Sequence, residues 1–184
     1  MSEKLQNILA MHCSPALFGI KASNLINCRK NEFPNIHIEI KLLNKKFNPK
    51  IFFKIIKEDE NNVYVLVFHK KYLMKTIFAS DNYNYLLEHS YPKEKDLNLY
   101  LNSLKERLKN KNFPHEIGVF LGYDLSDIIA FENKNCKCLY TGYWQVYSNL
   151  EEKLKTFASF TNCKNKVVSL INNGYRLENL IKGW

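Results

Sequence analysis

The sequence lacks most of the features that assign a chain to a class of protein. It has no internal repeat, no low-complexity tract and no run of about 18 apolar residues, so no transmembrane helix is expected. It also has no P-loop, HExxH, GxSxG or CxxC motif. P-loop nucleotide hydrolysis, zincin chemistry and thioredoxin-type exchange therefore have no support in the sequence.

Arginine is scarce, although the chain is basic. The formal net charge is +9, but only Arg29, Arg107 and Arg176 are arginines among the 27 basic residues. Arginine supplies the bidentate fork that reads base edges, so its scarcity disfavours nucleic acid as a partner. Abundant lysine and asparagine are also typical of codon bias in an AT-rich genome. A functional charge and a charge set by codon usage both stay open.

Cysteines are few and irregularly spaced. The five cysteines are an odd number without the spacing of a disulfide framework. The segment 1–6 shows no apolar region of a signal peptide. We therefore expect a cytoplasmic protein whose thiols are reduced.

The residues that are present indicate a globular chain. Hydrophobic residues make up 46% of the sequence and aromatic residues 14%, which is enough for a sizeable core. No composition shift or linker divides the 184 residues. The chain is therefore predicted to form a single domain, 1–184.

The predicted strands centre on a hairpin. Segments 51–57 and 63–69 are apolar and flank the polar run 58–62, which predicts an antiparallel pair. The second of these segments is apolar on both faces and is expected at the centre of the sheet. Segment 36–42 alternates strictly and is predicted as another strand, as is segment 138–147. With helices expected elsewhere, the fold class is α+β, a small and mostly antiparallel sheet covered by helices.

Capping signals predict where several helices begin. Asp96 and Asp124 each precede a run with helical spacing of apolar residues. Ser14 followed by Pro15 predicts a helix start, after a first short helix over 3–11.

The stretch 113–123 holds the first candidate residues for function. Pro114 suits the first position of a helix, and Gly122 suits the left-handed residue that ends one. His115 and Glu116 would then lie in the first helical turn, where the dipole favours a carboxylate. We predict both as catalytic residues; the alternative is that they only cap and pack the helix.

The second candidate is a cysteine beside the other predicted helix start. Cys13 directly precedes Ser14, and a thiol at a helix N-terminus has a lowered pKa. Lys21 adds positive charge if the chain folds back. Cys13 is therefore predicted as a nucleophile, redox group or metal ligand, and the alternative is a small buried apolar residue. The sharpest prediction is that Cys13 and His115 line one cleft, with Glu116 or Lys21 at its edge.

Two further groups lie near residue 140. On a strand, Cys136 and Cys138 would point to one face and could begin a metal site, although their spacing matches no standard zinc signature. Tyr143 and Trp144 could stack on a flat cofactor or belong to the core. The sequence leaves both the metal and the cofactor unspecified.

Segment 115–131 has the pattern of a helix-turn-helix, with a glycine at the turn and apolar residues on both sides. Its second helix would carry Asp124, Asp127 and Glu132 and no arginine, and acidic groups repel phosphates. Two packed helices are the preferred interpretation, and DNA binding is the alternative.

Four segments together resemble a known family: 12–25, 113–123, 142–147 and 157–163. They resemble a bacterial family of domains of unknown function, number 3793, that is common in anaerobic Gram-positive bacteria. The resemblance spans nearly the whole chain and is weakest in the Lys- and Asn-rich segment 41–75.

The resemblance marks motif positions without giving them roles, namely His12, Cys13, Lys21, His115, Glu116, Tyr143, Trp144 and Cys163. It carries over no activity. It implies genes for flavodoxin-like and iron-handling proteins nearby, and hence a redox or iron-handling protein as a partner. The candidate cofactor-binding residues are His12, Lys21, Tyr143 and Trp144.

Three classes of function follow. The leading prediction is a small cytoplasmic protein that is redox-linked or handles a metal or cofactor, with a cleft around Cys13 and His115; whether it is an enzyme stays open. The alternative is a non-catalytic binding module, either for nucleic acid through a Lys-rich surface and segment 115–131, or for a protein. A regulatory partner without a small-molecule site is the third class.

Overall fold

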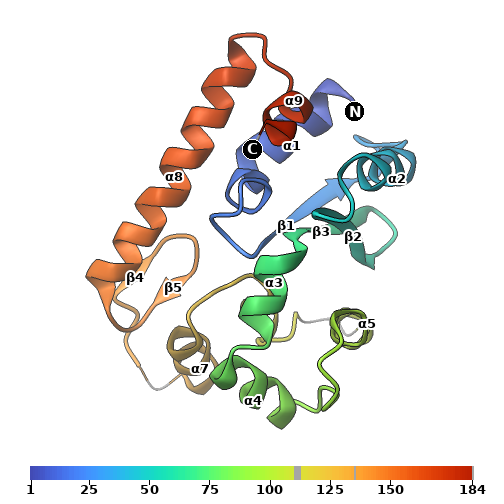
Figure 1. Ribbon diagram of the computed structural model, residues 1–184. Coiled ribbons are helices and arrows are strands. Elements are labelled where there is room, and N and C mark those ends of the chain that lie inside the picture. Colours follow the sequence, from blue (N-terminus) through green and yellow to red (C-terminus); the bar gives the residue numbers. More distant parts are fainter. Residues whose placement is uncertain (110–112, 135, 184) are drawn as a thin grey trace. The chain divides into compact units, whose positions relative to one another are not determined.

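The computed structural model describes residues 1–109, 113–134 and 136–183, and its elements are drawn in Figure 1. In chain order these elements are α1 (Glu3–Leu17), β1 (Ser23–Arg29), α2 (Ile36–Phe47), β2 (Ile51–Glu58), β3 (Asn62–His69), α3 (Lys70–Ile77), α4 (Ser80–Glu88), α5 (Leu97–Arg107), α6 (Ile117–Phe120), α7 (Leu125–Asn133), β4 (Tyr140–Thr141), β5 (Gln145–Val146), α8 (Leu150–Asn172) and α9 (Leu177–Lys182). The predicted α+β class is confirmed.

The chain folds into two compact units. Unit 1 comprises Met1–Tyr72 and Phe160–Trp184, and unit 2 comprises Leu73–Ser159. Helix α8 therefore begins in unit 2 and ends in unit 1. That the whole chain is one domain, 1–184, stays a prediction.

Unit 1 is built on a three-stranded antiparallel sheet in the order β1-β3-β2. Strand β3 pairs on both sides, so that Val63 lies opposite Cys28 of β1 and Glu58 of β2. The hairpin of segments 51–57 and 63–69 and the central place of its second strand are both confirmed. Val63 and the run from Val65 to Phe68 of β3 are buried, as expected of a strand with neighbours on two sides.

One face of this sheet carries the core of unit 1. Val63, Val65 and Val67 of β3 contribute to it. Helix α1 packs against β1 and β3, α2 packs against β2, and α9 packs against α1. Alternate residues of the central strand thus meet the apolar stripes of the helices, as the two periods of strand and helix require.

Segment 36–42 is not a strand, and this prediction was wrong. Helix α2 begins at Ile36 and buries Ile36, Ile40 and Leu43, while Ile38 is 61% exposed. The alternation of the short segment fits a strand, but the apolar positions continue at helical spacing beyond its end. The segment is a helix because packing against β2 buries the apolar residues that recur at helical spacing.

The predicted helix start at Ser14 was also wrong. Helix α1 runs on through Pro15, which has no N–H to give to the helix. Two side-chain hydrogen bonds lie beside the proline: the Ser14 hydroxyl donates to the Ala10 carbonyl at 2.5 Å, and the Asn24 side-chain oxygen accepts from the Ala16 N–H at 3.2 Å. The helix thus continues to Leu17 despite the proline.

Unit 2 is mainly helical. Asp96 caps α5 by accepting from the Leu99 N–H at 2.9 Å, and Asp124 caps α7 by accepting from the Ser126 N–H at 3.0 Å, so both predicted caps are confirmed. The predicted strand 138–147 is in fact a short hairpin of β4 and β5. In the described parts of the chain, no helix combines the length and the apolar character needed to cross a membrane.

Candidate functional site

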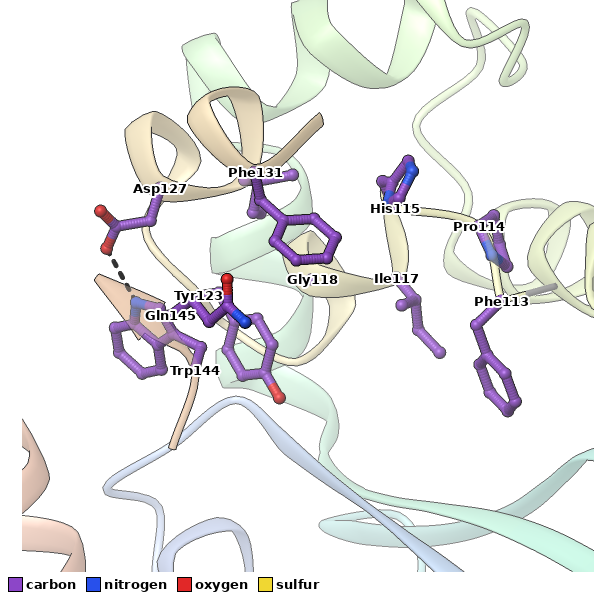
Figure 2. A pocket seen from close by; sticks show the side chains of 11 residues that line it. Phe113, Pro114, His115, Ile117, Gly118, Tyr123, Asp127, Phe131, Trp144 and Gln145 are labelled. Carbon is purple, nitrogen blue, oxygen red and sulfur yellow. Dashed lines mark hydrogen bonds between the residues drawn. The ribbon is translucent and has the colours of Figure 1, made fainter. Parts of the chain in front are cut away.

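Unit 2 contains a pocket of about 370 Å³ beside His115 (Figure 2). This volume is typical of a cavity for a small organic ligand. The wall comes from the loop before α6, from α6 and α7, and from β5. The described lining residues are Phe113, Pro114, His115, Ile117, Gly118, Tyr123, Asp127, Ile128, Phe131, Trp144 and Gln145. Most of these side chains are apolar or aromatic.

Two glycines allow α6 and α7 to form one corner of the pocket. Gly122 has a φ of +69° and closes α6 as predicted. A Cβ on Gly118 would lie 2.9 Å from the side chain of Ile128 on α7, so a larger residue would push the two helices apart. The preferred interpretation of segment 115–131 as two packed helices is confirmed.

His115 lies on the wall of the pocket. It precedes α6, which begins at Ile117, so it is not in the first helical turn as predicted. The residue is exposed, and its ring meets Phe131 edge-on with ring centroids 5.3 Å apart. An exposed imidazole can bond a bound molecule and still exchange a proton with water. The catalytic role of His115 stays a prediction.

Glu116 is buried in an ion pair. Its side chain is 3% exposed and pairs with Arg107 of α5. The Arg107 guanidinium lies 5.6 Å from the centroid of the Tyr91 ring. A buried carboxylate needs such a partner, because an unpaired charge would lose its hydration without compensation. The pair thus fixes the backbone next to His115, while the predicted catalytic role of Glu116 stays a prediction.

The central buried group of the site is Asp127, whose side chain is 1% exposed. It accepts hydrogen bonds from Nε1 of Trp144 at 2.8 Å, dashed in Figure 2, and from the Tyr147 N–H at 2.8 Å. The Lys153 ammonium lies 3.4 Å from Asp127 and 3.0 Å from Asp124. These contacts join α7 to β5 and to the first turn of α8.

This network decides the electrostatic character of the pocket. Asp127 is paired with buried Lys153, which it shares with Asp124, and its oxygens already accept from Trp144 and Tyr147. What remains for a ligand is aromatic surface, the His115 imidazole and the Gln145 amide. Such a lining suits a molecule with little or no charge.

The aromatic side of the pocket is built around Trp144. Its ring stacks on Tyr123 with centroids 5.0 Å apart and meets Phe157 of α8 edge-on at 4.5 Å. Burial raises the pKa of Tyr123. Tyr143 packs against Phe157 at 5.4 Å and is not among the described lining residues. Of the two aromatic residues predicted to bind a cofactor, Trp144 faces the pocket and Tyr143 packs against α8.

Cys13 lies in the core of unit 1 and has no exposed surface. Burial raises the pKa of its thiol, and the charge of Lys21 offsets only part of this effect. The predicted lowering of the Cys13 pKa was wrong for two reasons. Cys13 lies near the C-terminal end of α1 rather than before its start, and a buried thiolate loses its hydration.

The other predicted residues of this segment are also in unit 1. Lys21 is 6% exposed; burial lowers its pKa to about 8, and Cys13 acts in the opposite direction. Its ammonium lies 5.8 Å from the centroid of the Phe160 ring. His12 is an exposed residue of α1. The cleft shared by Cys13 and His115 stays a prediction.

Sequence reasoning missed several residues that shape the site, namely Tyr123, Asp127, Phe131, Gln145 and Lys153. One signal was available. The indole N–H of a partly buried tryptophan needs an acceptor, and Asp127 is a carboxylate in the first turn of α7, directly before the apolar run 128–131.

Metal ligands are not gathered in this pocket. In the ranges 1–109, 113–134 and 136–183, no three or more His, Cys, Asp or Glu side chains are placed to hold one metal ion. Cys136 and Cys138 precede β4, the first exposed and the second half-buried.

The comparisons with known proteins bear on the family and not on the chemistry. No curated protein and no solved structure matches this chain significantly. The model of a family described as protein of unknown function (DUF3793) matches residues 9–181. This range includes the pocket of unit 2, the glycines Gly118 and Gly122 of its α6–α7 corner, and the buried Cys13 and Lys21 of unit 1. Because the match covers nearly all of the 184 residues, the chain belongs to the DUF3793 family.

Proposed function

We propose that unit 2 binds a small, flat, uncharged organic molecule in the pocket beside His115, and that the protein handles such a molecule as a cofactor or ligand. The observation that carries this proposal is a cavity of about 370 Å³ with aromatic walls, in which the buried carboxylate is already engaged by Lys153, Trp144 and the Tyr147 N–H. Cavities of this kind, with a few polar groups on an apolar wall, are typical ligand sites.

The lining supports a specific division of roles. A flat ring gains contact area against Tyr123, Trp144 and Phe131, because aromatic side chains bury much surface and favour stacked or edge-on partners. His115 and Gln145 supply the polar contacts that orient the ring. Asp127 acts indirectly, since its bond to Trp144 holds the indole in place.

The proposal also covers the compartment in which the protein acts and its protein partner. All five cysteines are free, which fits the reducing cytoplasm of a bacterium. A redox or iron-handling protein is the proposed partner, and a redox-linked use of the bound molecule is part of the same hypothesis.

Fluorescence of Trp144 gives a direct test. The chain has two tryptophans, so Trp184→Phe leaves Trp144 as the single one. Titration with lumichrome, an uncharged tricyclic heteroaromatic, is expected to quench Trp144 emission saturably with one molecule bound per chain. Quenching that stays linear in probe concentration contradicts the proposal.

A matched pair of variants on α7 locates the binding. Phe131 and Ile129 are similarly exposed, at 41% and 39%, but only Phe131 is among the described lining residues. Phe131→Ala is expected to weaken lumichrome binding about two- to twelvefold, the range of one aromatic contact of about 0.5–1.5 kcal/mol. Ile129→Ala should bind like the parent. Equal losses in both variants would place the probe elsewhere.

The alternative of a nucleic-acid module has its own measurement. Retention on a DNA column that falls steeply with salt, in a protein that does not bind lumichrome, would replace the pocket hypothesis by the binding-module hypothesis.

A further inference from the structure

The Gln145 amide of the unit 2 pocket is oriented by the protein itself. Gln145 is an exposed residue of β5 that lines the pocket, and its amide is drawn in Figure 2. Its side-chain oxygen accepts a hydrogen bond from the Tyr147 hydroxyl at 2.7 Å. Both atoms of this contact are oxygens, so only the hydroxyl has a proton to give. Among the described residues, none accepts from the amide nitrogen, and Gln145 therefore offers N–H donors to a ligand.

Several oxygens of the pocket wall likewise accept hydrogen bonds from the protein. The buried Asp127 carboxylate accepts from the Trp144 indole at 2.8 Å and from the Tyr147 N–H at 2.8 Å. Three backbone carbonyls accept from N–H groups in the turns that begin and end α6, namely those of Pro114, His115 and Gly118. A ligand that donated to these oxygens would compete with bonds that are already formed.

Donors therefore prevail on the described part of the wall. An imidazole carries at least one N–H in each protonation state, so the exposed His115 adds a donor to those of Gln145. The Tyr123 hydroxyl can donate or accept, so it favours neither kind of ligand. Once a ligand covers a donor, the donor loses its water and needs an acceptor on the ligand. The wall thus discriminates between ligands by the groups at the edge of the ring.

We propose, as a consequence that rests on the proposed function, that the ligand of this pocket is a flat aromatic carbonyl compound whose carbonyl oxygen accepts from the Gln145 amide nitrogen. Quinones and ring diones belong to this class. A ring with an N–H group at the same edge brings a second donor against the amide, whereas a carbonyl completes the hydrogen bond. Tyr147 is a positioning residue, because its hydroxyl holds the amide oxygen and leaves the nitrogen for the ligand.

Three uncharged tricyclic compounds of nearly the same shape test this direction. Fluorenone has a carbonyl at its edge, carbazole has an N–H group there, and fluorene has only a CH2 group. Equilibrium dialysis against the full-length chain measures the Kd of each compound. Fluorenone is expected to bind about two- to twelvefold more tightly than fluorene, the contribution of one hydrogen bond, and carbazole is expected to bind more weakly than fluorene.

Variants of Gln145 test whether this residue is the donor. In Gln145→Glu the carboxylate keeps one oxygen for Tyr147 and replaces the NH2 group by an acceptor, so carbazole should bind more tightly than fluorenone. Thr141→Glu is the matched control for the added charge, since Thr141 lies opposite Gln145 in the hairpin and is not among the described lining residues. It should keep the parent's order of affinities. Tyr147→Phe frees the amide to rotate and should reduce the ratio of fluorenone to carbazole affinity, while fluorene binds as before.

Failure of the carbonyl class is distinguishable from failure of the proposed function. If neither lumichrome nor any of the three tricyclic compounds binds, the proposed function fails and the carbonyl class fails with it. If the parent binds the three compounds equally, or binds carbazole most tightly, the pocket remains a ligand site but its ligand is not selected as a carbonyl compound. An unchanged order of affinities in Gln145→Glu would show that Gln145 is not the donor.

Discussion

The two units differ in what surrounds their buried ionisable side chains. In unit 1 the candidate groups Cys13 and Lys21 lie within or beside an apolar core, and burial shifts the pKa of each towards its uncharged form. In unit 2 the buried groups Asp127 and Glu116 are paired with Lys153 and Arg107. Loss of hydration disfavours the charged form of a buried group, whereas an oppositely charged side chain within ion-pair distance favours it.

This difference bears on the proposed binding site in unit 2. In unit 2 the paired Asp127 accepts a hydrogen bond from Trp144, an aromatic residue of the pocket wall. The core of unit 1 gives Cys13 no surface at all. Within unit 2 a ligand can reach the predicted residue His115, whereas within unit 1 it cannot reach the predicted residue Cys13.

The largest expected effect comes from breaking the network of unit 2. Asp127→Ala leaves the Lys153 ammonium, the Trp144 indole and the Tyr147 N–H without this acceptor. We expect the free energy of unfolding to fall by about 3–5 kcal/mol, as for other buried ion pairs that lose one partner. Urea denaturation followed by circular dichroism measures this change.

Asp124→Ala is the control for that variant. It also removes a contact of Lys153, but from a carboxylate that is 41% exposed. The loss of this helix cap should cost about 1 kcal/mol. Equal effects of the two substitutions would show that Asp127 is not the centre of the network.

An intermediate effect is expected from Cys13→Ser in unit 1. The serine hydroxyl would be fully buried where the thiol now packs against apolar side chains, at a cost of about 1–3 kcal/mol if it finds no partner. Cys136→Ser, at an exposed position, should change stability by less than about 0.5 kcal/mol. Urea denaturation of both variants provides the comparison.

Thiol labelling sharpens the same contrast. In the native protein Cys136 should react quickly with Ellman's reagent, while Cys13 should react only on unfolding, because its thiol is buried and its pKa is raised. Fast labelling of Cys13 in the folded protein would restore it as an accessible nucleophile.

The smallest expected effect is a pH dependence in unit 2. His89 contacts the Tyr85 carbonyl at 2.8 Å and Glu132 at 3.2 Å, and Glu132 also accepts from the Tyr85 hydroxyl. Burial alone would lower the pKa of His89, but these two bonds and the nearby charges of Glu132 and Glu116 raise it. The imidazolium is therefore favoured in the folded protein.

The sign of the effect follows from this direction. Because the folded pKa is above the unfolded value of about 6.5, the stabilisation is complete below that pH and is lost as pH rises through the folded pKa. The exposed parts of His89 and Glu132 limit it to about 1 kcal/mol or less. Unfolding free energies from pH 5.5 to 8.5 should slope for the parent, and His89→Gln should remove this part of the slope. Identical slopes would exclude His89 as its source.

Local patterns in the sequence were sufficient for a large part of the fold. The polar run 58–62 between two apolar segments specified the hairpin of β2 and β3, and Asp96, Asp124 and Gly122 specified ends of helices. Each of these signals acts through hydrogen bonds or backbone angles within a few residues. The candidate stretch 113–123 likewise contributes several residues to the pocket wall.

Only the tertiary structure decided what is buried and with which partner. Segment 36–42 fits both periods, and packing of α2 on β2 selects the helix. Cys13 lies inside a core assembled from distant strands, so its pKa moves opposite to the local expectation. Asp127 becomes central only because Trp144 and Lys153 fold back onto α7. Burial and charge pairing depend on residues far apart along the chain, and the sequence pattern does not contain those distances.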